Sequence, residues 1–551
     1  MGEIGMILIL LTGVIATNAL ARALGGRIAL PLIQIAAGAA IGLTTDFGIV
    51  LEPELFFVLF LPPLLFLDGW RVPKHDLQDN APTILSLAFG LVFFTVLGVG
   101  ALLHLIIPSM PLAVCFALAA VLSPTDVVAA TAMMTNVPVP RRLQRILEGE
   151  AMFNDASGLV CLRLAVTVAM TGALPFWPSV GGLVWAALGG IALGLAVSQI
   201  IASLKFWITA RLGEDTSSYI LISLLTPYGA YLLAEAAGCS PVLAAVAAGI
   251  MMSRVEVSGQ ALAVTRIRRN AVWETLAFTL NGSIFLLLGE QLPGIVGRLQ
   301  AGAAESGHAG LGWLALYVIV VSVALAALRF VWVWLSVFVW LKRHPASTDH
   351  TRPNLRLVSV MSTAGVRGAV TLAGALSLPL MLPDGAPFPS RDLVILIAAG
   401  VILVSLVVAN ASLPGLLQGI KVPPEPHQDQ QERAARVEAA KAAIAALATA
   451  GKLPAGKSAA EAAEAGGYLA AVALVADYYQ HRLTRLEPDA QKAPADDTLH
   501  NEERLHVLAL RAERAAIANM ARGHRISTDL AHKLLRETDL SEAAFQNASD
   551  A

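Results

Sequence analysis

Residues 111–135 read PLAVCFALAAVLSPTDVVAATAMMT, and this stretch decides the fold. It is apolar almost throughout and long enough to cross a hydrocarbon core of roughly 30 Å as a helix. Pro124 lies in its middle and removes a backbone hydrogen-bond donor, so the helix is expected to break there. Backbone groups freed at membrane depth are tolerated where they line a wet cavity or hold an ion. The stretch therefore predicts a broken transmembrane helix with Thr125 and Asp126 at a functional site.

The two polar residues after Pro124 also admit a simpler interpretation. Thr and Asp side chains accept hydrogen bonds from the free N–H groups at the start of a helix. Thr125 and Asp126 would then cap the second half of a kinked span. Capping and ion binding are compatible, so both interpretations stay open.

The rest of the chain has the composition of a membrane protein. Of its 551 residues, 56% are hydrophobic and 14% are charged, whereas about a quarter of the residues of soluble proteins are charged. The long apolar runs of the chain lack the alternation of apolar and polar residues that marks a barrel strand, so we expect them to be helices. The first run has no basic residue ahead of it, which favours a retained span over a signal sequence. About thirteen apolar runs of spanning length recur, near 4–23, 28–45, 49–67, 81–107, 111–135, 144–171, 180–204, 216–237, 239–253, 271–296, 310–341, 355–382 and 391–418.

Basic residues are distributed asymmetrically between the connections. If the N-terminus is outside, the inward connections hold nearly all of the Lys and Arg residues, and the outward ones hold only Arg298 and Arg391. The positive-inside rule then predicts an outside N-terminus and a cytoplasmic C-terminus. This orientation requires an odd number of spans, in agreement with thirteen.

A change of composition at Lys421 predicts a second domain. Residues 421–551 are rich in Ala, Glu, Lys, Arg and Gln and begin with several prolines, which stop a helix. Apolar residues at three-and-four spacing near 431–449, 459–486 and 502–522 predict amphipathic helices. We therefore expect a transmembrane domain over 1–420 and a helical cytoplasmic tail over 421–551.

The sixth run carries acidic residues inside lipid. Glu150 and Asn154 are four residues apart and share a helix face, with Asp155 about 100° further round. Two carboxylates this close cannot both stay charged unless a cation or a basic partner is present, or one holds a proton. An ionisable group at this depth is a functional candidate by default.

The twelfth run supplies a basic partner, Arg367, between Gly365 and Gly368. These glycines weaken the helix at mid-membrane, as Pro124 does in the fifth run. The two interrupted runs are seven spans apart and so cross the bilayer in opposite directions. This pattern is typical of an inverted repeat in which two broken, crossing helices enclose a midplane site.

Three ordered motifs resemble the NhaP/NHE branch of the monovalent cation:proton antiporters, which includes bacterial Na+/H+ exchangers. They are Ser-Pro-Thr-Asp at 123–126, Glu-x-x-x-Asn-Asp at 150–155 and Gly-x-Arg-Gly-Ala-Val-Thr at 365–371. The resemblance covers the membrane part and the style of the tail. It implies a homodimer in the bacterial inner (plasma) membrane that exchanges one ion for one proton. The implied movement is an elevator-like shift of a core bundle against a dimerisation bundle.

The resemblance also implies roles for individual residues. Asp155 is the implied ion- and proton-binding carboxylate, and Asp126 and the Thr125 carbonyl help it to hold Na+. Glu150 is implied to pair with Arg367, and Asn154 to orient that pair and to belong to the cation- and proton-binding site. Among the other intramembrane charges, Glu290 and Arg329 are expected to snorkel near span ends. They are left out of the ion site, as are Arg163 and Glu235.

Two positions depart from the family pattern. Many relatives have a serine after the glutamate, whereas this chain has Ala151, so water is expected to replace one ligand. Relatives often have an acid four positions beyond Pro62-Pro63, whereas here Asp68 is one position later. Asp68 is a possible accessory residue of the site, or it lies at the interface beside Arg71.

The sequence thus predicts an electroneutral sodium/proton antiporter in which cation and proton compete for Asp155. A potassium/proton antiporter is the alternative on the same atoms. A cation channel or an ion-coupled carrier of organic acids is less favoured, because the site pairs its acid with an arginine and no further polar cluster is present. No enzyme motif stands in the chain, and we expect no cofactor and no nucleic-acid partner.

Overall fold

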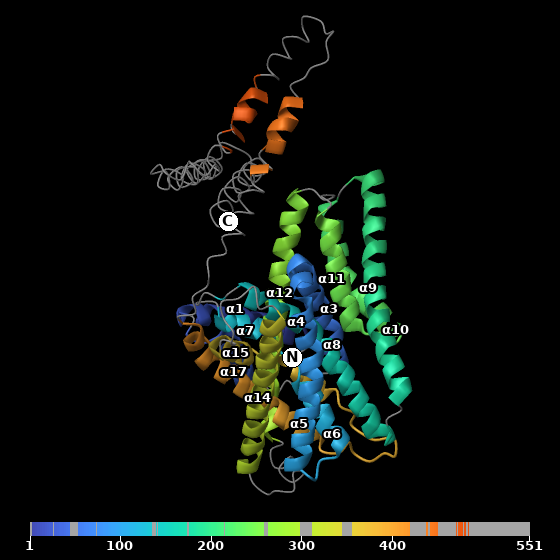
Figure 1. Cartoon of the computed structure of the whole chain (residues 1–551), viewed down its shortest axis with the longest axis vertical. Helices are drawn as coiled ribbons and strands as arrows, with labels where there is room; N and C mark the ends of the chain where they lie inside the picture. Colours follow the sequence, from blue (N-terminus) through green and yellow to red (C-terminus); the bar gives the residue numbers. More distant parts are fainter. Residues whose placement is uncertain are drawn as a thin grey trace, which may run out of the picture. The chain divides into compact units, whose positions relative to one another are not determined.

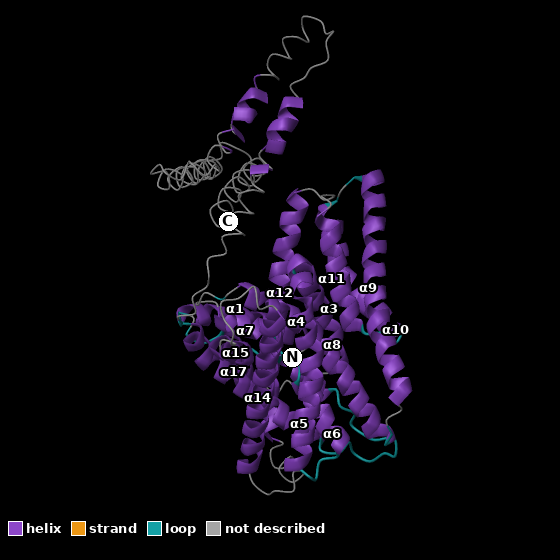
Figure 2. Ribbon diagram, viewed as in Figure 1, coloured by secondary structure: helices purple, strands orange, loops and turns teal. Residues whose placement is uncertain are grey.

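The computed structural model describes most of the membrane part and short pieces of the tail. In residues 1–422 it describes 3–25, 27–44, 53–72, 74–134, 139, 141–173, 176–213, 215–257, 263–297, 311–343 and 355–418. Beyond these it describes 437–438, 441–449, 470, 472–477, 479–480 and 483. Regular structure in the described residues is helical (Figure 2), apart from one isolated bridge between Met381 and Pro387.

The helices follow the apolar runs (Figure 1). Their bounds are α1 Glu3–Ala23, α2 Leu30–Thr44, α3 Pro53–Arg71, α4 Lys74–Leu85, the π-helix η1 Ser86–Leu91, α5 Val92–Ile106, α6 Leu112–Leu122, α7 Val127–Met134, α8 Arg141–Thr171, α9 Phe176–Leu212, α10 Thr216–Ala236, α11 Pro241–Val257, α12 Ala263–Gly297, α14 Leu311–Arg343, α15 Leu355–Thr363, α16 Ala369–Leu376 and α17 Arg391–Leu417.

The predicted polytopic, all-helical fold is confirmed. Nine spans in the described residues are long and apolar enough to cross a membrane, and the bent pair α6–α7 forms a tenth. The shorter apolar helices α2 and α11 and the interrupted pair α15–α16 occupy the three remaining predicted runs. Each of the roughly thirteen runs therefore contains a helix or a broken helix.

The two broken helices meet at their breaks. The α6–α7 pair bends by 42° around Pro124, and the α15–α16 pair is interrupted at 364–368. The backbone N–H of Asp126 donates to the carbonyl of Val366 over 2.7 Å, which joins the two breaks directly. Gly368 permits this approach, because a Cβ there would lie 2.1 Å from Oδ2 of Asp126. The breaks at Pro124 and at the glycines thus form one crossing point, as predicted.

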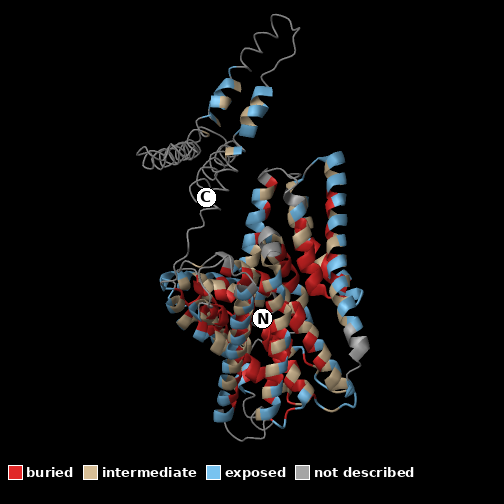
Figure 3. Ribbon diagram, viewed as in Figure 1, coloured by how far each residue is buried: buried red, intermediate tan, exposed pale blue. Residues whose placement is uncertain are grey.

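Two groups of helices surround the crossing point. On one side α8 packs on α6 and η1, and α14 packs on α15 and α17. On the other, α2 packs on α12, and α11 packs on α3 and α9. Side chains between neighbouring helices are buried, while α1 and α9 expose apolar residues along their length (Figure 3). Such exposed apolar faces are expected where lipid is the solvent.

A π-helical turn fixes the position of α8. The turn η1 interrupts the run of α4 and α5, and a π-helix displaces the regular backbone hydrogen bonds. Ser157 on α8 donates its hydroxyl to the carbonyl of Ala88 in this turn over 2.6 Å. About two turns earlier on α8, Gly149 leaves room for the side chain of Ile84 near the end of α4. These contacts hold the middle of α8, and with it residues 150–155, against η1 and the end of α4.

The chain divides into two compact units, Met1–Val422 and Pro423–Ala551. In the second unit the described residues are helical, at 441–449 and in parts of 470–483. These segments fall within the first two predicted amphipathic stretches. The third predicted stretch, 502–522, lies outside the described residues.

Candidate ion-binding site

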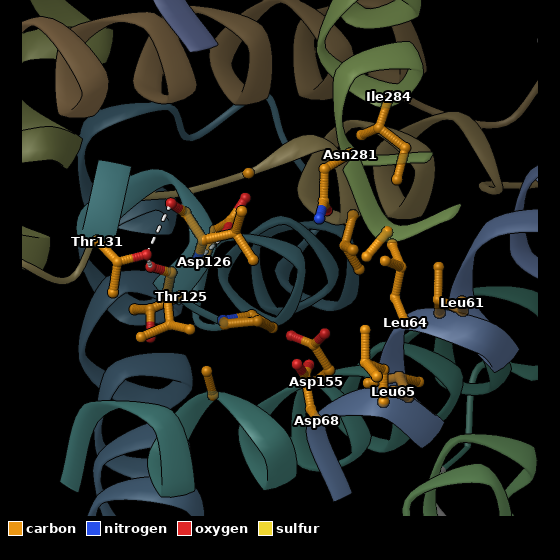
Figure 4. A pocket seen from close by; sticks show the side chains of 18 of the residues that line it. Leu61, Leu64, Leu65, Asp68, Thr125, Asp126, Thr131, Asp155, Asn281 and Ile284 are labelled. Atoms are coloured by element: carbon orange, nitrogen blue, oxygen red, sulfur yellow. Dashed lines mark hydrogen bonds between the residues drawn. The ribbon is translucent and has the colours of Figure 1, made fainter. Parts of the chain in front are cut away.

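A cavity lies beside the crossing point. Its volume is about 310 Å³, and its walls come from α3, the α6–α7 break, α8, α12 and the start of α16. Asp155, Asp126 and Thr125 all line it, as do Asp68 and Asn281 (Figure 4). The structure therefore brings three of the four residues predicted at the cation- and proton-binding site into one cavity, together with polar groups from two further helices.

Asp155 projects into this cavity from α8, and Asp68 faces it from α3 (Figure 4). The carboxylates of Asp126 and Asp68 are both close enough to Asp155 to interact with it electrostatically. Three neighbouring acidic groups of one sign in a membrane domain repel each other unless a cation or a proton neutralises part of their charge. Asp68 thus faces the cavity, and it also lies near enough to Arg71 to interact with that charge.

Asp126 caps the second half of the broken helix. Its Oδ1 accepts hydrogen bonds from the backbone N–H groups of Val128, at 2.8 Å, and Ala129, at 3.1 Å. Its Oδ2 faces Gly368 on the other broken helix. The capping interpretation therefore holds for Asp126, whose side chain also lines the cavity, but not for Thr125, whose hydroxyl donates to Glu150.

The prediction that Glu150 pairs with Arg367 is wrong, because Glu150 pairs with a different arginine. Glu150 is held by Arg329 of α14, whose Nη1 pairs with Oε1 and whose Nη2 pairs with Oε2 over 2.7 Å. Both side chains are only 2% exposed. Arg329 also donates its Nε to the carbonyl of Met361, near the end of α15, over 2.9 Å. The expectation that Arg329 snorkels near a span end is likewise wrong, because its guanidinium is buried between α8 and α15.

Arg367 binds backbone carbonyls instead. Its Nε donates to the carbonyl of Leu122 over 3.0 Å, and its Nη1 donates to the carbonyl of Gly365. Leu122 is the last residue of α6, and Gly365 follows the end of α15. The last carbonyls of a helix have no partner within it and carry the negative end of the helix dipole. A cation is stabilised at such a position, so Arg367 neutralises the ends of both half-helices.

Asn154 faces the ion pair and not the cavity. Its Nδ2 donates to Oγ1 of Thr125 over 2.9 Å, and the Thr125 hydroxyl donates to Oε1 of Glu150 over 3.2 Å. Asn154 is not among the residues that line the cavity. It is therefore connected to Glu150 through Thr125, and it positions the break that holds Thr125 and Asp126.

The cavity carboxylates do not form a metal site by themselves. No group of three or more His, Cys, Asp and Glu residues in the described part of the chain is arranged to hold a metal ion. Ala151 lines the cavity without offering a side-chain oxygen. A cation beside Asp155 would take its other ligands from hydroxyl, carbonyl and amide oxygens or from water, which suit hard monovalent ions.

Sequence reasoning missed two residues here. Arg329 carried a signal, because an arginine within the apolar run 310–341 has a cost unless it is paired. Asn281 of α12 carried a weaker one, because a single amide in a long apolar run is common. Its side chain points into the cavity (Figure 4).

Comparison with known proteins relates the membrane part to transporters. The family described as "Sodium/hydrogen exchanger, transmembrane" matches residues 7–419. The uncharacterised Na+/H+ exchanger YjcE of Escherichia coli (strain K12) is 39% identical over 553 residues and covers 98% of this chain and 98% of its own. The sodium, potassium, lithium and rubidium/H+ antiporter of Bacillus subtilis (strain 168) is 41% identical over 421 residues. That match covers 75% of this chain and 61% of the Bacillus protein.

A solved structure shares the fold. The sodium proton antiporter MjNhaP1 of Methanocaldococcus jannaschii matches with a TM-score of 0.55 and 17% identity. The match covers 77% of this chain and 99% of that protein. At this identity the likeness concerns the fold alone.

Proposed function

Because the chain belongs to the sodium/hydrogen exchanger family, we propose that it exchanges Na+ for H+ at Asp155 across the bacterial inner membrane. The chain is a multi-pass membrane protein and a cation/proton antiporter, not an enzyme. The observation that supports Asp155 is its place in the cavity beside Thr125 and Asp126, at the crossing of the two broken helices. Sodium is the transported substrate, held at Asp155, Asp126 and Thr125.

Competition for one carboxylate couples the two fluxes. When neither a cation nor a proton is bound, Asp155 carries an uncompensated negative charge in the cavity. A state in which the cavity is closed from water is then unfavourable, because that charge would lose its hydration. A bound cation or a bound proton neutralises that charge, so only the loaded forms pass between inward and outward states. The cation and the proton therefore move in opposite directions through the same site.

The exchange is proposed to be electroneutral. Glu150 and Arg329 neutralise each other, and Arg367 stays on its carbonyls. These fixed charges do not change with the cargo, so one cation replaces one proton at Asp155. A membrane potential imposed with valinomycin and K+ should leave the rate of exchange unchanged.

The movement is proposed to be an elevator shift within a homodimer. The cavity lies between α3 and α12 on one side and α6–α7, α8 and α16 on the other. Sliding the second group past the first would carry Asp155 from one membrane face to the other. Asp68, on α3, would meet Asp155 in only part of this movement, which makes it an accessory residue. The proposed orientation has the N-terminus outside and the C-terminus in the cytoplasm.

Potassium is the second candidate cation. The Bacillus relative, by its name, exchanges sodium, potassium, lithium and rubidium for protons. Carboxylate, hydroxyl and amide oxygens accept each of these ions, since all are hard cations. The same site would then serve a potassium/proton antiporter.

The test is dye-based antiport in proteoliposomes with Asp155→Asn. This change keeps the volume of the side chain and removes the titratable charge, so cation-driven proton flux should be lost. Asp384→Asn is the matched control, because that carboxylate lies in a loop and, among the described residues, accepts a hydrogen bond only from the backbone N–H of Ala386. Full exchange by Asp155→Asn would refute the assignment. In the unchanged protein the apparent KM for Na+ should rise as pH falls, by up to about tenfold per pH unit, since one proton competes with one cation.

A further inference from the structure

Asn281 is the one polar side chain that α12 contributes to the cavity. The lining residues of this helix are Ala277, Asn281, Ile284 and Phe285, which follow one helix face. The carboxamide points from this apolar face toward the space in front of Asp126 and Asp155 (Figure 4). It therefore stands on the wall opposite the helix that carries Asp155.

The amide of Asn281 makes no hydrogen bond to any other residue within the described part of the chain. Its neighbours on α12 show the contrast, because Thr275 and Thr279 return their hydroxyls to carbonyls of their own helix. An amide within a membrane span costs free energy unless water, an ion or another polar group binds it. Asn281 is thus a polar group whose partners must come from the contents of the cavity.

The cation needs such a group. The carboxylates of the cavity do not form a group of three arranged to hold a metal ion, and the side chain of Ala151 adds no oxygen to those of Asp155 on the wall of α8. Amide carbonyl oxygens are ordinary ligands of hard cations in proteins. The Oδ1 of Asn281 is an oxygen of this kind, and which end of the amide faces the ion follows from the bonds it makes.

We propose that Asn281 supplies an oxygen ligand to the cation at Asp155 and thereby contributes to the choice between Na+, K+ and Li+. A proton on Asp155 needs no such ligand, so Asn281 acts on the cation and not on the proton. Because the ligand comes from the wall that does not carry Asp155, it is available only when α12 faces the site. This inference rests on the proposed exchange at Asp155.

The experiment measures proton flux in proteoliposomes against the concentrations of Na+, K+ and Li+ for Asn281→Ala and Asn281→Asp. Loss of one ligand should raise the apparent KM for Na+ about tenfold and change the ratio of the Na+ and K+ constants, with the rate at saturating cation preserved. Asn281→Asp keeps an oxygen at the site and should retain a KM below that of Asn281→Ala. Thr279→Ala, which alters a polar residue of the same helix that bonds its own backbone, should leave all constants unchanged.

Unchanged cation constants in Asn281→Ala would overturn the proposal, as would equal changes in all three ions together with an unchanged Na+/K+ ratio. If Asn281→Ala does not accumulate in the membrane, Asn281→Leu, which keeps a side chain of similar size without an oxygen, decides: cation constants that equal those of the unchanged protein overturn the proposal, and an altered Na+/K+ ratio supports it. Failure of the underlying exchange is seen separately, since it would appear as full activity of Asp155→Asn.

Discussion

The buried pair of Glu150 and Arg329 allows the sharpest test of the core. Glu150→Gln keeps the shape of the side chain but leaves the guanidinium of Arg329 without its counter-charge. Both groups are 2% exposed, and Nη2 and Oε2 are 2.7 Å apart. The variant should therefore be strongly destabilised, because the charge that remains cannot reach water.

The size of the effect follows from this geometry. Unit charges 4 Å apart interact by about 4 kcal/mol at an effective dielectric constant near 20, and removal of one partner of a buried pair costs about 3–5 kcal/mol. Glu150→Gln and Arg329→Gln should each lower the free energy of unfolding by about this amount. The double variant should cost far less than their sum, which gives a coupling energy of about 3 kcal/mol or more.

The assay is reversible unfolding of the detergent-solubilised protein in a titration with SDS. A second cycle with Arg367→Gln is the control, since Arg367 binds the carbonyls of Leu122 and Gly365 and not Glu150. Arg367→Gln alone should destabilise, but its coupling to Glu150→Gln should stay below about 1 kcal/mol. A larger coupling to Arg367 than to Arg329 would refute this account of the core.

Two further predictions concern the crossing of the broken helices. Gly368→Ala should abolish exchange, because the new Cβ would lie 2.1 Å from Oδ2 of Asp126. Gly374→Ala should retain exchange, because its Cβ would lie 3.4 Å from the nearest atom, in Val121. Equal proton flux from the two variants in proteoliposomes would contradict the reasoning. Asp126→Asn keeps an oxygen for the N–H groups of Val128 and Ala129, so it should lose cation affinity but retain the unfolding midpoint. Asp126→Ala should lose cation affinity and also lower the free energy of unfolding by about 1 kcal/mol through loss of the cap. Similar midpoints for both variants would show that the cap contributes nothing to stability.

The sequence was sufficient for features that depend on local chemistry. The spans follow from the length of the apolar runs, and the breaks follow from Pro124 and from Gly365 and Gly368. Asp155 and Asp126 were predicted as site residues because a carboxylate within a membrane span costs free energy and is therefore a functional candidate. The meeting of the two breaks beside Asp126 was also expected, since paired broken helices of opposite direction enclose a site near the middle of the membrane.

Features that depend on the rotation of distant helices were not accessible. Glu150 and its partner Arg329 are 179 residues apart, and no periodicity shows which face of α14 meets α8. Arg367 was predicted as the partner of Glu150 because it lies in a recognisable motif, but its guanidinium donates to backbone carbonyls instead. Asn281 is uncharged, so only the structure reveals that its face of α12 lines the cavity. The π-helical turn near Ala88 likewise left no mark in the composition of its run.

The arrangement of the arginines explains why Asp155 is the group left to change its charge. The ends of α6 and α15 present carbonyls at membrane depth, and these accept from Arg367 at Leu122 and Gly365 and from Arg329 at Met361. The guanidinium groups of Arg367 and Arg329 thus stabilise two negative helix ends, and Glu150 neutralises the charge of Arg329 in a direct ion pair. Asp126 is fixed in turn by the N–H groups at the start of α7. Each of these charges has a partner within the protein, whereas Asp155 accepts no hydrogen bond from a described residue and faces the cavity. Asp68, the other cavity carboxylate without such a bond, lies near enough to Arg71 to interact with its charge. A group whose partner is mobile is the one that can exchange a cation for a proton, which is why the proposed coupling depends on this carboxylate.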